Sequence, residues 1–495
     1  MRARKLSLLA ALLALAACAT APRTTPAPAA PATASGTASA AASAAEATAH
    51  VPVPPLGPPV QLALPAPQRF QLSNGLAVRL VESHRLPIVA FHLVLREGGA
   101  ARDPAELPGL ASFTAAMVTE GTRTRSAIQI SDELGFLGAS LGAGASMDAA
   151  YVSGYGLSRQ LPRLLALLAD VTENPTFPAS DFARVQDQRK VALLQQRDQP
   201  GALASKAFGP LFWGDHPYGH WAGGTEASVE RTTREDLARF HAAHWRPGAA
   251  ELVVVGDVDA GVLRAELEKA FAGWTGAEPV RSAPAEAPAG KRRAVLVEKP
   301  AAPQTFLILG MPGIARNDPD LAAAQVLFEV LGGGSSSRLF RELREAKGYT
   351  YGLTARESAQ AQGGASYLGG SVRADATGEA IRDLLAQVAA LRDAPVPEAE
   401  LEDAKDGIVR SLPGDFATVA GIAGRMAEQV VYGLPDDYWD RYPAAVRAVT
   451  AADVRRVARE VLDPARLTTV LVGDPAVVRG QLGGLPIGEV EVRSP

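Results

Sequence analysis

Histidines are the residues of this chain whose spacing could bind a metal ion. His241 and His244 are separated by two residues in a stretch that we expect to be helical, and His216 and His220 form a second pair. Imidazoles three positions apart on a helix can bind one ion, but no acidic or thiolate partner lies near them in the sequence. We therefore expect these four residues to be helix-terminal or core histidines.

Other kinds of active site find little support in the sequence. The run Gly332–Gly334 is followed by serines, but it lacks the Lys-Ser/Thr ending of a phosphate-binding P-loop, so we expect a tight backbone turn at a helix end. We expect no nucleophile elbow of the kind that a serine hydrolase uses. The single cysteine, Cys18, excludes intrachain disulfides and thiolate zinc sites.

The residues around Cys18 are typical of a targeting sequence. Three basic residues precede an apolar run over residues 6–17, which is too short to span a bilayer. The run ends in Leu-Ala-Ala-Cys, which resembles a bacterial lipobox, so we expect Cys18 to be lipidated; the alternative is a plain secretory signal peptide. Ala19 gives no inner-membrane retention signal, which favours an outer-membrane anchor facing the periplasm.

Length and composition limit the architecture. A chain of 495 residues is too long for one core and suggests at least two domains. Its net charge of −4 gives no electrostatic argument for a nucleic-acid partner. Residues 19–65 are almost wholly Ala, Pro, Thr, Ser and Gly, and we expect a disordered tether there.

An internal repeat indicates that one structural unit is used twice. Each copy has a Thr-x-x-Asp capping signal, an amphipathic helix that ends before a proline, and a β-branched run that ends in Gly-Asp, with the same Thr-to-Gly separation in both copies. Strands mixed with helices favour an α+β fold of two homologous sandwich domains, each an antiparallel-rich sheet with helices on one face. The repeated residues are Thr233, Asp236, Pro247 and Gly256-Asp257 in the first copy and Thr450, Asp453, Pro464 and Gly473-Asp474 in the second.

Three segments resemble the insulinase/pitrilysin family of inverted zinc-motif peptidases. Residues 108–122, PGLASFTAAMVTEGT, have the Pro-Gly-Leu-Ala entry and the Gly-Thr exit of the family's zinc-binding helix. Residues 216–241 resemble a connector of its first domain, and residues 331–353, LGGGSSSRLFRELREAKGYTYGL, resemble its most recognisable C-terminal segment. The resemblance implies an N-terminal peptidase-like domain at 66–276, a linker at 277–292 and a C-terminal domain at 293–488.

The positions that the family uses for zinc are changed in this chain. Where the family has His-x-x-Glu-His, this sequence has Ser112, Ala115 and Ala116. The family's third ligand is a glutamate on a later helix, and we place the matching position at Leu194 or Gln195. Neither residue is a carboxylate, so we expect this chain to bind no zinc.

The resemblance implies that a second pair of functional residues is kept. In the family, an arginine and a tyrosine seven residues apart contact the substrate backbone, and the matching residues here are Arg344 and Tyr351. A guanidinium is a permanent multi-donor cation, and a phenol can donate to a carbonyl or oxyanion. Tyr349 is a competitor for the tyrosine role; otherwise the arginine would pair with Glu342 or Glu345 and the tyrosine would pack on its sheet.

This pattern resembles the non-catalytic subunit of two-chain bacterial members of the family. We expect the chain to bind extended peptide, partly through an edge strand in the region of residues 88–96, and to complete the active site of a zinc-bearing paralogue. On this hypothesis the zinc belongs to the partner subunit. The alternative is a structural or assembly scaffold at the membrane surface that has no role in peptide turnover.

Overall fold

The computed structural model of the chain describes residues 57–58, 66–276, 285 and 290–494. The expected signal peptide with Cys18, nearly all of the expected tether at 19–65 and most of the expected linker at 277–292 lie outside the described residues. The described residues from Pro58 onward form one compact unit. The fold and the sites described below belong to this unit.

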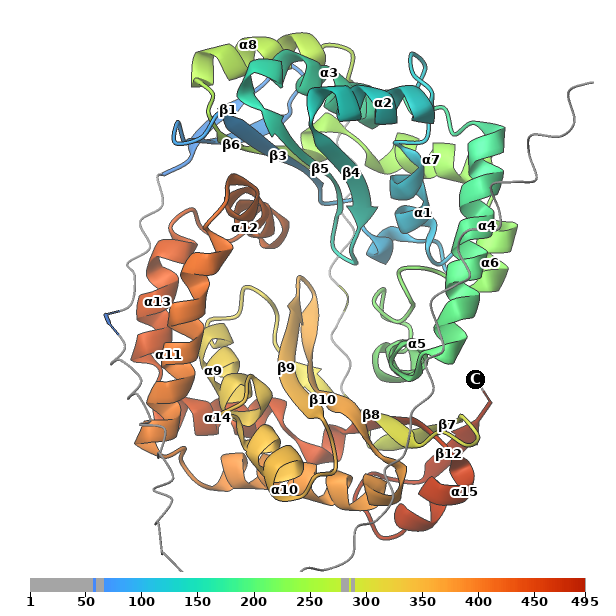
Figure 1. Cartoon of the computed structure of the whole chain (residues 1–495), viewed down its shortest axis with the longest axis vertical. Coiled ribbons are helices and arrows are strands. Elements are labelled where there is room, and N and C mark those ends of the chain that lie inside the picture. The colour runs from blue at the N-terminus through green and yellow to red at the C-terminus, as the bar shows by residue number, and fades with distance from the viewer. Residues whose placement is uncertain (1–56, 59–65, 277–284, 286–289, 495) are drawn as a thin grey trace, which may run out of the picture. The chain divides into compact units, whose positions relative to one another are not determined.

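The first half of this unit contains a six-stranded mixed sheet with the strand order β1-β2-β6-β3-β5-β4 (Figure 1). β2 and β6 are parallel, and all other neighbouring strands are antiparallel. An Asn74-Gly75 turn joins β1 to β2, and Gly75 has the positive φ, 92°, that favours glycine. The strands are β1 (Gln68–Gln71), β2 (Ala77–Glu82), β3 (Ile88–Leu95), β4 (Ser140–Ala145), β5 (Ala150–Leu157) and β6 (Ala250–Gly256).

The second half contains a six-stranded sheet with the order β12-β7-β11-β8-β10-β9. From its second strand onward this order repeats that of the first sheet, because β7 and β11 are parallel and the next neighbours are antiparallel. Only the outer strand differs, since β12 pairs in parallel with β7. The strands are β7 (Arg293–Glu298), β8 (Gln304–Gly313), β9 (Gly352–Gln360), β10 (Gly363–Arg373), β11 (Thr468–Gly473) and β12 (Val490–Arg493).

The capping signals of the internal repeat are confirmed. Thr233 caps helix α7 (Arg234–His244), and Thr450 caps α14 (Ala451–Val461); each accepts a hydrogen bond from the backbone of the aspartate three residues later. Both form reciprocal capping boxes, which satisfy backbone N–H groups that a helix start leaves unpaired. Each helix is followed by a 3₁₀ turn that starts at the predicted proline and then by the sheet strand β6 or β11.

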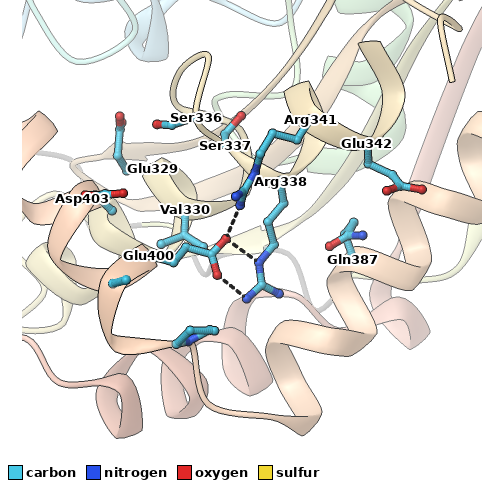
Figure 2. Close-up of a pocket in the computed structure, with 13 residues that line it drawn as sticks. Glu329, Val330, Ser336, Ser337, Arg338, Arg341, Glu342, Gln387, Glu400 and Asp403 are labelled. Atoms are coloured by element: carbon cyan, nitrogen blue, oxygen red, sulfur yellow. Dashed lines mark hydrogen bonds and ion pairs between the residues drawn. The ribbon is translucent and has the colours of Figure 1, made fainter. Parts of the chain in front are cut away.

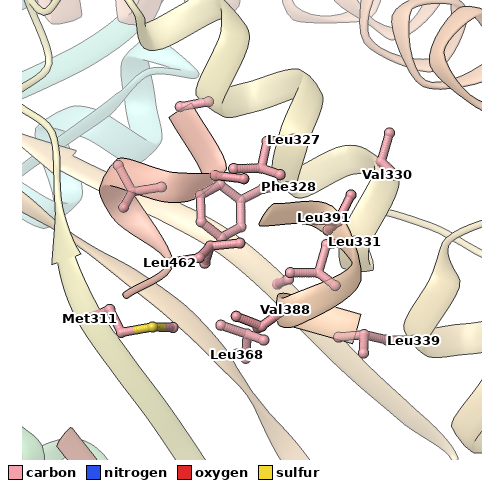
Figure 3. Packing of buried hydrophobic residues seen from close by; sticks show 14 of the residues in the cluster. Met311, Leu327, Phe328, Val330, Leu331, Leu339, Leu368, Val388, Leu391 and Leu462 are labelled. Atoms are coloured by element: carbon pink, nitrogen blue, oxygen red, sulfur yellow. The ribbon is translucent and has the colours of Figure 1, made fainter. Parts of the chain in front are cut away.

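Helices cover the outer face of each sheet, as the fold class predicts. Helices α3 and α8 cover the first sheet, and α9, α10 and α14 contribute to the large core behind the second sheet, part of which is shown in Figure 3. The helices are α1 (Leu110–Met117), α2 (Ala127–Leu137), α3 (Leu161–Glu173), α4 (Ala179–Gln195), α5 (Pro200–Trp213), α6 (Glu226–Arg231), α8 (Ala260–Ala270), α9 (Leu321–Gly332), α10 (Thr377–Asp393), α11 (Glu398–Asp415), α12 (Val419–Tyr432), α13 (Tyr438–Ala448) and α15 (Pro475–Val478).

The two halves exchange helices across their inner sheet faces. Helix α5, from the first half, packs on β8 and β11 of the second sheet, where Phe208 and Phe212 meet Ile308 and Val470. Helix α12, from the second half, packs on β3 and β6 of the first sheet (Figure 1). Each sheet is therefore covered on its second face by a helix from the other half, which the sequence did not predict.

The prediction of a peptide-binding edge strand in the region of residues 88–96 is wrong. The strand at Ile88–Leu95, β3, lies between β6 and β5 and is hydrogen-bonded on both sides. The edges of the first sheet are β1 and β4 instead. Within the part of the chain that the structure describes, no helix combines the length and apolar character needed to cross a membrane.

Candidate functional site

Helix α1 carries the three positions at which a zinc motif would lie. Its first turn follows Gly109, whose φ is 94° and whose added Cβ would lie 2.6 Å from the Cα atom of Gly224. Ala115 is fully buried in the core of the first sheet, as expected for a small residue that lets the helix pack closely. Ser112 and Ala116 are half-buried and one turn apart, so they share a face of the helix.

A guanidinium from α4 lies against this face. Arg189 Nη2 donates a hydrogen bond of 2.6 Å to Ser112 Oγ and one of 3.3 Å to the carbonyl oxygen of Gly223, so it links α4, α1 and the segment before α6. The guanidinium also lies 4.9 Å from the centre of the Phe113 ring. Among the described residues it has no carboxylate within ion-pair distance, and its buried Nε has no hydrogen-bond partner. Burial lowers the pKa of Arg189 to about 10, which leaves it charged at neutral pH.

The expected fourth position of the zinc motif needs correction. Gln195, the last residue of α4, is exposed, and Leu194 is 46% exposed, so neither side chain belongs to the inner face of the helix. The buried α4 residues are Val185 and Leu193, and Arg189 lies between them at helical spacing. The residue that meets Ser112 from α4 is therefore Arg189, which sequence reasoning missed.

This group of residues does not fit a zinc ion. Zinc in proteins is held by thiolate, imidazole or carboxylate ligands, whereas this face presents a serine, an alanine and a cation. No three His, Cys, Asp or Glu side chains come together as a possible metal site anywhere in the described ranges. We therefore derive no chemistry of this chain from a metal.

The four histidines at metal-like spacing have structural positions. His241 Nε2 lies 2.8 Å from the carbonyl oxygen of Thr172, and burial lowers the pKa of His241 to about 4. His244 stacks on Phe240 in the last turn of α7. His216 is buried, and His220 lies 3.1 Å from Asp103, a carboxylate that also accepts backbone hydrogen bonds at the start of α1. The prediction of helix-terminal or core histidines is confirmed for His241, His244 and His216.

The structure brings Arg344 and Tyr351 together. Arg344 lies on a π-helical segment, η5 (Phe340–Ala346), a rare geometry that is frequent at functional sites. Its guanidinium lies 4.6 Å from the centre of the Phe340 ring and 4.4 Å from that of the Tyr351 ring, so the cation is in contact with two aromatic rings. Tyr351 immediately precedes β9 and is 83% exposed, which leaves the phenol accessible.

The local structural roles considered for these two residues are not observed. Glu342 pairs with Lys347 at 2.8 Å, and no ion pair of Arg344 is found among the described residues. The competitor Tyr349 is engaged, because its hydroxyl lies 2.6 Å from Glu379 Oε2 and its ring packs against the core of the second half. Tyr351 is therefore the more exposed tyrosine of the two.

The glycine-serine run has a structural setting that does not favour a phosphate. Gly332 ends α9, and the serines that follow line a cavity of about 560 Å³ between α9 and α11 (Figure 2). Arg338 makes two hydrogen bonds with Glu400, of 3.0 and 2.7 Å, and Arg341 makes one of 2.8 Å (Figure 2). Both cations are therefore already paired with a carboxylate.

Comparison with known proteins agrees with this geometry. A family model described as insulinase (peptidase family M16) matches residues 79–209, and one described as peptidase M16 inactive domain matches residues 231–408. The chain belongs to the insulinase family. The first match contains α1 and the second contains Arg344 and Tyr351, so the family assignment covers both groups of residues.

Relatives and solved structures cover most of the chain. An uncharacterized zinc protease of Streptomyces coelicolor is 27% identical, and the match covers 80% of this chain and 87% of the relative. An uncharacterized zinc protease of Mycobacterium bovis is 29% identical, and the match covers 80% of this chain and 91% of the relative. The crystal structure of a peptidase M16 inactive domain from Pseudomonas fluorescens is 29% identical, with a TM-score of 0.76, and covers 82% of this chain and 98% of that one. A protease from Helicobacter pylori, at 20% identity and a TM-score of 0.75, shows the same fold. The chain is thus an inactive, peptidase-like member of the insulinase family.

Proposed function

We propose that this chain is the non-catalytic subunit of a two-chain metallopeptidase. It binds peptide and supplies Arg344 and Tyr351 to the active site of a paralogue that carries the zinc. The observation that carries the proposal is the contrast between the two sites. A buried guanidinium fills the degenerate zinc site, whereas Tyr351 is 83% exposed and stacks on an arginine with no ion pair among the described residues.

The chemistry of the pair suits a contact with a peptide bond. Stacking on Phe340 and Tyr351 holds the Arg344 side chain in place while its N–H groups remain donors. A phenol fixed beside a cation is a good donor to a carbonyl oxygen on which negative charge develops. In this proposal Arg344 and Tyr351 orient the peptide and stabilise that oxygen, and the partner subunit provides the metal and the base.

Peptide binding is assigned to β4 rather than to β3. β4 is an edge of the first sheet, and an extended peptide can add to an edge strand through backbone hydrogen bonds. Ser140, Gly142 and Gly144 lie opposite Tyr155, Ser153 and Tyr151 of β5, so small side chains on β4 keep this edge open. The inner-face tyrosines of β5 are partly exposed beside it.

The N-terminal motif supports a proposal for the location of the subunit. We propose that Cys18 is lipidated and anchors the chain to the outer membrane, facing the periplasm, and that the partner works at the same surface. Two or more acyl chains on one cysteine would give stable anchoring. The zinc would be bound by the partner, and peptide would be the substrate.

Reconstitution with a paralogue that keeps His-x-x-Glu-His tests the proposal. The chain alone should contain less than stoichiometric zinc and cleave no peptide, whereas the pair should cleave and lose activity with EDTA. Arg344→Ala should lower turnover by the pair without preventing its assembly. An isolated chain that binds one tight zinc and cleaves peptide would contradict the proposal, and unchanged turnover by the Arg344 variant would favour an assembly scaffold.

A further inference from the structure

A second cavity, of about 580 Å³, lies on the inner face of the second sheet. One wall is formed by β9 and β10, and the opposite wall by α5 and the segment that follows it. The cavity is separate from the Arg338 cavity, from Ser112 and from Arg189, none of which lines it. Its lining is aromatic on one side and polar on the other.

The polar wall is one face of an edge strand. β9 ends the order of the second sheet and, among the residues that the structure describes, is paired only with β10. Residues at alternate positions of β9 line the cavity, whereas Leu353 and Ala355 point into the core behind the sheet. A strand with one free edge and one face along a cavity is the arrangement that accepts an added peptide strand. The lining residues of β9 are Gly352, Thr354, Arg356, Ser358 and Gln360.

The other walls supply apolar surface for a side chain. Phe208 and Trp213 of α5 are buried below the cavity, and Tyr367 of β10 lies 5.0 Å from Phe208 between ring centres. Trp221 closes a further side. The Arg356 guanidinium lies 5.6 Å from the Tyr367 ring centre, so the cation covers part of the aromatic surface. These walls would bury a large apolar side chain and leave its backbone at the edge of β9.

The cavity is continuous in sequence with the proposed functional pair. Tyr351 immediately precedes Gly352, the first residue of β9 and of the cavity wall. At the other end of β9, the Tyr218 hydroxyl lies 3.1 Å from the backbone nitrogen of Gln362 and is hydrogen-bonded to Asp148. A peptide held at Tyr351 can therefore run along β9 toward a hairpin tip that is fixed to the first half.

We infer that β9 is a second peptide-binding edge, and that its cavity selects extended peptide segments with a large aromatic or aliphatic side chain. This inference rests on the proposed function and names its substrate class. The peptide pairs its backbone with β9 and places the large side chain against the aromatic surface that Phe208, Trp213 and Tyr367 form. The next side chain along the peptide points away from the cavity, because side chains alternate on a strand.

The test measures peptide binding by the chain alone, without a paralogue. Isothermal titration calorimetry would use a blocked hexapeptide of threonines with one central phenylalanine. We expect saturable binding that weakens at least about tenfold when the phenylalanine is replaced by alanine, because a large buried side chain is lost. Methylation of alternate peptide nitrogens should also abolish binding, since it removes the donors that pair with an edge strand.

A cavity-filling variant locates the binding site. Gly209 of α5 lines the cavity, and a Cβ added there meets no atom closer than 3.8 Å, so Gly209→Leu is expected to add side-chain volume at the cavity wall. Gly261→Leu, at a helix position with nothing within 4 Å and outside the cavity, is the matched control. Binding should weaken at least about tenfold in the first variant and remain unchanged in the second.

Two results would overturn the inference. One is equal affinity of Gly209→Leu and the unaltered chain, both checked as folded by circular dichroism. The other is equal affinity for the phenylalanine peptide and its N-methylated form, a comparison that needs no variant. If either occurs while Arg344→Ala still lowers turnover by the reconstituted pair, the β9 site is wrong and the proposed function stands.

Discussion

Arg189 on α4 donates a 2.6 Å hydrogen bond to Ser112 on α1, the residue that we predict to stand at the family's first zinc-binding position. The guanidinium stacks on Phe113 and also donates to Gly223. A metal bound there would tie α1 to α4, and the arginine now ties the same two helices with a single positive charge. In this chain a cation therefore joins the two helices at the position where we expect the family's metal.

Restoring the histidines should not restore zinc binding while Arg189 is present. Ser112→His with Ala116→His places two imidazoles one turn apart, but the nearby guanidinium repels a divalent cation. Two unit charges about 4 Å apart near a protein surface interact with an energy of about 4 kcal/mol. Adding Arg189→Glu removes the repulsion and supplies a carboxylate. We expect zinc affinity at least about a hundredfold higher, measured by competition with a chromophoric chelator.

The control for this experiment is Arg184→Glu in the same double-histidine background. Arg184 lies on the same helix, and its side chain is 44% exposed. It should change zinc affinity little, since exposed charges are screened. Equal zinc affinity of the double-histidine variant with Arg189 and with Glu at that position would show that the arginine does not exclude the metal.

A buried polar cluster should hold the two halves in register at their hairpin tips. Asp148, in the turn between β4 and β5, accepts hydrogen bonds from the Tyr218 hydroxyl and from the backbone of Ala361, in the turn between β9 and β10. Burial raises the pKa of Asp148, so its charge depends on these donors. Tyr218→Phe should lower the free energy of unfolding by about 1 kcal/mol in a urea titration, because it removes one donor from a partly buried carboxylate.

Hydrogen exchange can separate this effect from a general loss of stability. Exchange in Tyr218→Phe should increase most at residues 146–149 and 361–362, which the cluster joins. Tyr155→Phe is the control, because Tyr155 is 50% exposed and lies in the same sheet. Similar exchange at both tips in the two variants would mean that the cluster does not fix the hairpins.

His241 should make stability depend on pH. Burial lowers its pKa to about 4 from an unfolded value of 6.5, so below 6.5 the unfolded chain binds a proton that the folded chain does not. Stability is therefore fully present above pH 6.5 and falls as the pH decreases toward 4. At pH 5 the loss should be about 1–2 kcal/mol, and His241→Gln, which keeps a donor for Thr172, should remove it.

An exposed histidine gives the opposite sign for comparison. Asp257 raises the pKa of His84, whose contribution to stability is present below pH 6.5 and is lost as the pH rises through the folded-state pKa. The free energy of unfolding of His84→Gln should therefore fall more steeply with decreasing pH than that of the unaltered chain. Urea titrations at pH 7 and pH 5 test both variants, and parallel curves for His241→Gln and the unaltered chain would contradict the assignment.

The parts of the fold that depend on local signals could be predicted from the sequence. Each capping threonine and its aspartate lie three residues apart, so the hydrogen bond that caps α7 or α14 depends only on residues within one helical turn. The repeat then follows, because matching caps, prolines and strands recur at one spacing. The Asn74-Gly75 turn is a similar case, since the φ of 92° is a local requirement.

Strand order and helix exchange could not be predicted in this way. β3 is an interior strand because β6, from far along the chain, inserts between β2 and β3, and no residue of Ile88–Leu95 encodes that neighbour. Likewise α5 has an apolar face, but its sequence does not indicate that this face packs on the second sheet rather than on the first. Non-local pairings of this kind are decided by tertiary packing.

The contact of Arg189 with α1 was not predicted, although the sequence of α4 contains a pattern that indicates it. Val185, Arg189 and Leu193 recur at intervals of four, which places the arginine on the apolar face of α4. Gln195 is off this face and exposed. A count of helical positions inward from the apolar residues would have identified Arg189 as the residue that meets α1.

Turnover by the reconstituted pair tests the central claim most directly, with two tyrosine variants that differ only in position. Tyr351 is exposed, whereas the Tyr349 hydroxyl is hydrogen-bonded to Glu379. With assembly verified by size-exclusion chromatography, Tyr351→Phe should lower kcat by about 10²-fold, the effect of removing one oxyanion donor, and Tyr349→Phe should leave kcat unchanged. Unchanged kcat in an intact complex with Tyr351→Phe would contradict the account.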